Sequence, residues 1–255
     1  KLPRCLLPFP KPKPPLSMKS TPYLLVFAFF TLLTSKGLGQ ARSSASKAQS
    51  FDITQLNPGS YDGSWWNRSP VRLIQTNLRE IDALMDTDAY VQSMVDASAT
   101  VVMLNVGGIV ANYPSKLTYH FVNQHMKGDL VGDLVRKLHA KGIKVIGRFD
   151  FSKINETFAT QKPDWLYVGT NGQHVNYNGQ VHTCINGGYQ QEYGFEILKE
   201  AITNYPFDGI FFNMIGYTTS DYSGPYHRIC QGTNCKKRVH DETGMTLPTK
   251  AQMND

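Results

Sequence analysis

The sequence predicts an α/β fold, a (β/α)8 TIM barrel that is truncated after about four βα units. Two observations lead to this prediction. Short apolar runs alternate with segments of helical periodicity, an order consistent with a parallel sheet joined by right-handed crossovers. Polar residues follow the C-terminal end of each run, where α/β barrels place their chemistry. A complete barrel takes about 250 residues, whereas only about 185 follow Ser69, so we expect the first half of one.

Four apolar runs are the strand candidates. They are Leu73-Ile74, Val101 to Leu104, Val145-Ile146 and the run within Phe207 to Tyr217, FDGIFFNMIGY. The last run follows the turn pair Asp208-Gly209, and its continuous apolar character is typical of a strand buried on both faces. Asp208 precedes its strand, so we expect it to be purely structural.

Helical patterns fill the gaps between these strands. Each pattern places mostly apolar residues on one helix face. The first consists of Val91, Met94, Val95 and Ser98. The second follows Asp129 and consists of Leu130, Val131, Leu134, Val135 and Leu138. The third precedes Pro206 and consists of Phe195, Leu198, Ala201, Ile202 and Tyr205. A Rossmann sheet requires a glycine-rich turn directly after its first strand. The segment QTNLREID has no glycine, so the pattern favours the barrel.

The basic character of the chain is concentrated at its front. Residues 1–47 hold eight basic residues and no acidic ones, which leaves 18 basic and 20 acidic residues in the remainder. The net charge of +6 therefore reflects the leader. A domain that binds nucleic acid usually carries a basic surface. The residues after the leader are slightly acidic in sum, so we do not expect nucleic acid as a partner.

Residues 18–39 read as a signal peptide. A short basic start at Met18-Lys19 precedes an uncharged core from Tyr23 to Thr34, and Gly37-Leu38-Gly39 supplies the small residues of a cleavage site. The core is shorter than the roughly 20 residues that span a bilayer. We expect a secreted or periplasmic protein without stable membrane insertion after cleavage.

The remaining boundaries follow from composition. Residues 1–17 are Pro-rich and precede Met18, so we interpret them as an upstream, non-native segment. Residues 40–69 are a linker and lead-in, and residues 70–255 are the N-terminal half of the barrel domain.

The predicted site is built for a sugar. Polar strand-end residues are Asn77, Asn105, Arg148, Asp150 and Asn213, and the loop aromatics and imidazoles are Tyr113, Tyr119, His120, Trp165, Tyr177, His182 and Tyr217. Aromatic faces stack on sugar rings, while amide, carboxylate and guanidinium groups fix hydroxyls. The expected partner is a carbohydrate, and no cofactor is expected.

The cysteines allow two interpretations. Cys230 and Cys235 sit close together in the loop CQGTNC, and export favours a disulfide between them. Zinc held by His227, Cys230, Cys235 and His240 is the alternative, but that spacing matches no tight ligand pattern. No metal is therefore expected, and Cys184 stands alone.

Several long segments carry a family resemblance. They are VRLIQTNLREIDALMD, VVMLNVGGIVANYPSKLTYH, HMKGDLVGDLVRKLHAKGIKVIGRFDFSKINETFATQKPDWLYV, NYNGQVHTCINGGYQQEY and YPFDGIFFNMIGY. From about Trp65 to Val239 the chain resembles the secreted bacterial "hypothetical glycosyl hydrolase" family, whose barrel is similar to that of α-L-fucosidases.

This resemblance implies a retaining glycoside hydrolase, with a carboxylate nucleophile at the end of the fourth strand and an acid/base from later in the chain. Asn213 occupies the nucleophile position, and an amide cannot act as that nucleophile. Asp150 and Asp221 are the alternative carboxylates. Asn186, in the fourth segment, joins the substrate-binding candidates Asn105, Tyr119, His120, Arg148, Trp165, His182 and Tyr217.

The sequence thus predicts an α-L-fucosidase-like glycoside hydrolase that acts on a carbohydrate by two-carboxylate chemistry. This 255-residue chain is expected to be inactive by itself, because half of the catalytic apparatus is missing from it. A non-catalytic sugar-binding barrel and a protein-interaction scaffold are the alternatives.

Overall fold

The computed structural model describes residues 64–217, 219–221 and 224–249. All of them belong to one compact unit, residues 45–255. The predicted segments 1–17 and 18–39 lie outside the described residues, as does most of the predicted linker 40–69. Within the described ranges, no helix combines the length and apolar content needed to cross a bilayer.

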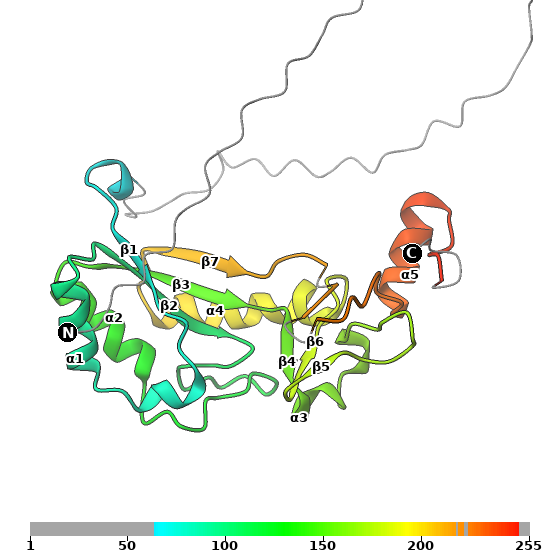
Figure 1. Ribbon diagram of the computed structural model, residues 1–255, viewed down its shortest axis with the longest axis horizontal. Helices are drawn as coiled ribbons and strands as arrows, with labels where there is room; N and C mark the ends of the chain where they lie inside the picture. Colours follow the sequence, from blue (N-terminus) through cyan, green and yellow to red (C-terminus); the bar gives the residue numbers. More distant parts are fainter. Residues whose placement is uncertain (1–63, 218, 222–223, 250–255) are drawn as a thin grey trace, which may run out of the picture. The chain divides into compact units, whose positions relative to one another are not determined.

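A four-stranded parallel sheet forms the centre of the fold (Figure 1). Its strands are β1 (Leu73–Gln75), β2 (Val101–Gly108), β3 (Lys144–Asp150) and β7 (Gly209–Asn213). They pair in the order β1-β2-β3-β7, the order in which they occur in the chain. The predicted α/β class and all four predicted strands are confirmed. The described residues do not form a closed barrel.

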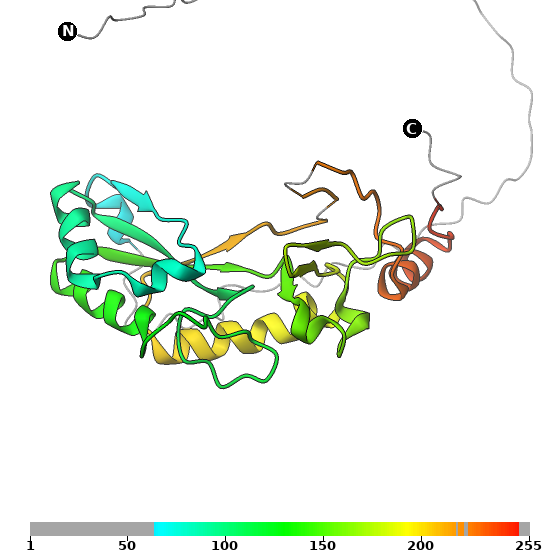
Figure 2. The same ribbon diagram turned by 60° about the horizontal axis from the view of Figure 1, so that its bottom comes forward.

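Three helices connect the strands, as predicted. They are α1 (Thr87–Asp96), α2 (Leu130–Ala140) and α4 (Gly194–Asn204). Asp86 caps α1 by accepting hydrogen bonds from the N–H groups of residues 88 and 89, and Asp129 caps α2 in the same way through residue 132. In Figure 2, α4 runs along one face of the parallel sheet.

The remaining elements are short, except for α5, which has 11 residues. They are η2 (Trp65–Asn67), η3 (Glu80–Leu84), β4 (Lys153–Asn155), α3 (Glu156–Ala159), η4 (Pro163–Trp165), β5 (Asn176–Tyr177), β6 (Gln180–His182), the π-helical turn η5 (Tyr189–Tyr193) and α5 (Thr233–Thr243). β4, β6 and β5 form a second, antiparallel sheet directly after β3. The sequence analysis did not find this sheet, because two- and three-residue strands are too short to show a periodicity.

β2 is the buried strand of the parallel sheet. Val102, Leu104 and Val106 are fully buried in the main hydrophobic core on its helix side, and Val101 and Met103 are buried on the opposite face. A parallel strand covered on both faces reads as a continuous apolar run, as this one does.

β7 corrects one prediction. The sequence predicts a strand buried on both faces, yet Ile210, Phe211 and Phe212 each remain 38–39% exposed. The reason is positional: within the described part of the chain β7 is an edge strand, hydrogen-bonded only to β3. The apolar sequence of β7 predicts that the segment is a strand, but it does not show whether other elements cover the faces of that strand.

Asp208 ties the N-terminal ends of β3 and β7 to α2. One carboxylate oxygen accepts from Lys144 Nζ at 2.8 Å, and the other contacts His139 Nε2 at 2.8 Å and the N–H of Val145 at 2.9 Å. Burial by itself raises the pKa of Asp208, but these hydrogen bonds outweigh it and lower the pKa below the usual aspartate range. The geometry agrees with the expected structural role.

His120 locks the C-terminal end of β2. Its Nε2 accepts the N–H of Gly108 at 3.0 Å, and its Nδ1 lies 3.1 Å from Ser115 Oγ, which donates to Glu200 of α4 at 2.6 Å. The close approach of β3 requires glycine at position 108, because a Cβ there would lie 2.1 Å from the carbonyl oxygen of Asp150. The relay joins this strand end to α4.

His120 was predicted to bind substrate, and its position corrects that prediction. The side chain is only 2% exposed and faces the core. Burial lowers its pKa to about 4, against a smaller opposing effect of the Glu200 charge. The imidazole is therefore a neutral structural group at neutral pH.

We expect Asp208→Asn to lower the free energy of unfolding by about 1–3 kcal/mol, because the amide loses the charge that Lys144 pairs with and has one acceptor oxygen in place of two. Urea unfolding of the variant beside Asp164→Asn, an exposed aspartate, is the measurement. Equal stability of the two variants would contradict the role given to Asp208.

The lowered pKa of His120 leads us to expect that the folded protein loses stability in acid. Its folded pKa lies below the ordinary value of 6.5, so the unfolded chain takes up a proton first as the pH falls. Stability therefore falls from about pH 6.5 towards about pH 4, by up to about 3 kcal/mol. Unfolding of His120→Gln should show a shallower pH dependence over that range, whereas the exposed His125→Gln should follow the wild type. Parallel profiles for all three proteins would refute the prediction.

Candidate sugar-binding site

The C-terminal edge of the parallel sheet holds a cavity of about 460 Å³. All four strands contribute to it or to the residues that follow them. The strand-end side chains that line it are Asn77, Asn105, Arg148, Asp150 and Asn213, the five polar residues that the sequence analysis placed at strand ends. Other lining residues are Leu78, Arg79, Glu80, Gly107, Ile109, Val110, Asn112, Lys153, Gln180 and Met214.

Strand register brings the polar residues together. Asn105 pairs with Arg148 across β2 and β3, and Asp150 pairs with Asn213 across β3 and β7. The β2–β3 register shifts between Asn105 and Gly107. Such an irregularity re-aims side chains at the end of a strand and is common next to active sites.

Asp150 has a fixed carboxylate. Its Oδ2 accepts from Asn213 Nδ2 at 2.6 Å, and its Oδ1 accepts from the N–H and the hydroxyl of Ser152 at 3.0 and 2.5 Å. These three hydrogen bonds set the direction in which the free lone pairs of the carboxylate point. Asn213 thus positions a carboxylate instead of supplying one.

Arg148 and Asn105 form the second fixed pair. Arg148 Nη1 donates to Asn105 Oδ1 at 2.7 Å, and Asn105 Nδ2 donates to the carbonyl oxygen of Leu78 at 3.1 Å. Within the described ranges, Asn105 is the one residue that accepts from the guanidinium. A guanidinium has five N–H donors, so Arg148 keeps donors for a ligand that carries hydroxyl or carboxylate oxygens.

Sequence reasoning missed five polar residues of the cavity, which are Arg79, Glu80, Asn112, Lys153 and Gln180. Glu80 opens η3, while Lys153 and Gln180 belong to the small antiparallel sheet. A rule that looks only at the residues directly after long strands cannot find them. Glu80 is the more consequential omission, because Glu80 and Asp150 are the two acidic residues among the lining residues described above.

Three further substrate-binding candidates lie in packed regions. Tyr119 and Trp165 form edge-to-face contacts with one another, with ring centroids 5.5 Å apart, and both pack on Tyr193. Trp165 is only 9% exposed, and His182 is fully buried beside Tyr167 and His227. None of these three residues lines the cavity. Their rings instead pack against other aromatic side chains of the fold.

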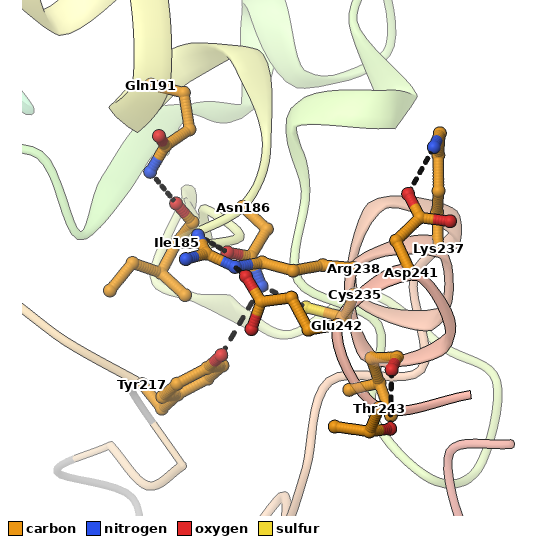
Figure 3. A network of polar contacts seen from close by, with 11 residues as sticks. Ile185, Asn186, Gln191, Tyr217, Cys235, Lys237, Arg238, Asp241, Glu242 and Thr243 are labelled. Carbon is orange, nitrogen blue, oxygen red and sulfur yellow. Dashed lines mark hydrogen bonds and ion pairs between the residues drawn. The ribbon is translucent and has the colours of Figure 1, made fainter. Parts of the chain in front are cut away.

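Asn186 and Tyr217 lie together near α5 (Figure 3). Asn186 Nδ2 is 3.4 Å from the Tyr217 hydroxyl, and its Oδ1 accepts from Arg238 at 3.0 Å. Asp221, the other predicted carboxylate, is almost fully buried and pairs with His227 at 3.0 Å. These three residues do not line the cavity, so Asp150 is the carboxylate candidate that does.

The cysteines differ from the predicted arrangement. Cys230 and Cys235 are buried free thiols, so the predicted disulfide is not formed in the structure. Cys184, which the sequence analysis left alone, lies 3.3 Å from Cys235 and 3.7 Å from Cys230, measured between sulfur atoms. Cys184 is distant from the other two cysteines in the sequence, so local cysteine spacing could not predict that the three lie together.

Solved structures similar to this chain include glycosidases. Alpha-L-fucosidase isoenzyme 2 from Paenibacillus thiaminolyticus matches with a TM-score of 0.53 and 19% identity, over 68% of this chain and 26% of that one. A hypothetical protein from Ruminiclostridium thermocellum matches with a TM-score of 0.46 and 15% identity, over 69% of this chain and 93% of that one. This chain thus spans about a quarter of the fucosidase, and the likeness concerns the fold.

A comparison with curated proteins finds no match. The model of the family described as hypothetical glycosyl hydrolase 6 matches residues 86–214, half of the chain. This range contains α1, β2, α2, β3, α4 and β7, and it confirms the family resemblance carried by the sequence. The chain belongs to the hypothetical glycosyl hydrolase 6 family.

Proposed function

We propose that the cavity at the sheet edge binds a sugar and that Asp150 is a catalytic carboxylate of a glycoside hydrolase. One observation carries the proposal: Asp150 lies at a strand end in a cavity, with its carboxylate fixed by Asn213 and Ser152. A held carboxylate is one of the two carboxyl groups that glycosidic hydrolysis requires, and the neighbouring amide and guanidinium groups can hydrogen-bond sugar hydroxyls. An α-L-fucoside is the first substrate to test, in view of the fold similarity to a fucosidase.

The same proposal includes the barrel. The four parallel strands pair in chain order with helices between them, and in this proposal they are the first four βα units of a (β/α)8 barrel. The exposed apolar residues of β7 support this idea, since a further strand and its helix would cover them. In such a barrel the cavity would lie on the catalytic face.

Two placements of the second carboxylate compete. Hydrolysis needs two carboxyl groups about 5–5.5 Å apart for retention or about 6.5–9.5 Å apart for inversion. The family resemblance implies an acid/base from later in the chain, whereas Glu80 supplies a second acid within the described cavity. Glu80→Gln distinguishes them, because it abolishes turnover only in the second case.

We expect Asp150→Asn in the full-length protein to lower turnover of an activated aryl α-L-fucoside or related glycoside by about 10²–10⁴-fold. Sugar affinity should change little, since shape and most hydrogen bonds remain. Rate assays and calorimetric titration of the variant, with Asp164→Asn as the matched surface control, provide the measurement. Unchanged turnover in Asp150→Asn would refute the catalytic role, and sugar binding without any turnover in the wild type would favour the non-catalytic alternative.

We also propose that the protein is exported, on the basis of the residues 18–39 alone. Cleavage after Gly39 should give a mature chain that begins near Gln40, because the apolar core and small-residue site match a signal peptide. N-terminal sequencing of protein recovered from the producing cells checks this. A mature chain that retains Tyr23 to Thr34 would contradict it.

A further inference from the structure

Three cysteines meet away from the sugar cavity. Cys184 follows β6, Cys230 precedes α5, and Cys235 lies in the first turn of α5. Their three sulfur atoms lie within 4.8 Å of one another, and each residue is at most 2% exposed. Segments about 50 residues apart in the sequence thus place three sulfur atoms at one buried point.

The sulfur separations are close to those of a metal site. Zinc–thiolate bonds of about 2.3 Å at tetrahedral angles place neighbouring sulfur atoms about 3.8 Å apart. The sulfur of Cys184 lies 3.7 Å from that of Cys230 and 3.3 Å from that of Cys235. One ion can therefore contact all three with small side-chain shifts, whereas a disulfide would use two sulfur atoms and leave the third buried beside them.

The surroundings of the sulfur atoms supply donors. Cys230 Sγ lies 3.5 Å from the N–H of Val168 and 3.4 Å from the N–H of Gly232. Cys235 Sγ lies 3.2 Å from Asn186 Nδ2, and Figure 3 shows this amide directed at the sulfur. Outer hydrogen bonds of this kind orient ligands and stabilise thiolates at metal centres.

Cation choice follows from the ligand set. Soft thiolates select zinc and other thiophilic ions over magnesium or calcium, which prefer oxygen ligands. The histidines considered from sequence do not take part. His227 pairs with Asp221, and His240 is exposed on α5.

We propose that Cys184, Cys230 and Cys235 bind one zinc ion, with water at the fourth tetrahedral position. Within the described residues no fourth cysteine, histidine, aspartate or glutamate joins the group. The ion joins the loop after β6 to the start of α5, and so attaches the C-terminal helix to the small sheet. This role is independent of sugar chemistry.

The test is metal analysis of the full-length protein, purified without chelators or added oxidants. We expect about one zinc ion per chain by elemental mass spectrometry, with loss of zinc in Cys184→Ser and in Cys235→Ser. His240→Gln, which removes a ligand of the alternative zinc set, should keep its zinc. Full zinc occupancy in both serine variants, or no zinc together with a disulfide between any two of the three cysteines, would overturn the proposal.

Two further measurements do not depend on the folding of the serine variants. Wild-type protein reconstituted with Co²⁺ should show intense sulfur-to-cobalt charge-transfer absorption in the near ultraviolet. Asn186→Ala leaves all three cysteines in place but removes the amide that donates to Cys235 Sγ, together with the contacts of that amide to Arg238 and Tyr217, and it should weaken zinc affinity by about 10–100-fold in a chelator competition. Absence of the charge-transfer band, or unchanged affinity in Asn186→Ala, would contradict the assigned geometry.

Discussion

The backbone pairing of four parallel strands is the constraint on which the site depends. Because the strands run in one direction and pair in chain order, their C-terminal ends meet at a single edge. Register then sets Asn105 beside Arg148 and Asp150 beside Asn213. These four side chains reach the cavity because of their places in the strands, so the sheet fixes their positions.

The two edges of the sheet serve different purposes. At the N-terminal edge, Asp208 uses its whole carboxylate to hold α2, β3 and β7 together. At the C-terminal edge, Asp150 is held by neighbours but faces a cavity of about 460 Å³. The buried relay from His120 to Glu200 supports that edge from behind, since it fixes the end of β2 against α4. The structural contacts of Asp208 and the candidate site thus lie at opposite ends of the strands, the arrangement that α/β barrels use.

The four parallel strands, the helices between them and the polar residues at the strand ends could be predicted from the sequence, because hydrophobic periodicity and the order of the apolar runs can be read along the chain. The exposure of β7, the short antiparallel sheet, and the cysteine cluster depend on contacts between distant segments. The aromatic and imidazole residues of the predicted site lie outside the cavity for a related reason, since their positions also depend on contacts between distant segments. His120, Trp165 and His182 have the chemistry of sugar sites, but only tertiary packing shows that they are buried.

The central claim is that the sheet-edge cavity receives the sugar. The most direct measurement is an NMR titration of the protein with L-fucose and with other monosaccharides, following the side-chain amide resonances of asparagine. The account predicts that Asn105 and Asn213 shift with one sugar and saturate, while Asn186, near α5, does not move. Shifts confined to Asn186, or no saturable shift with any sugar tested, would contradict it.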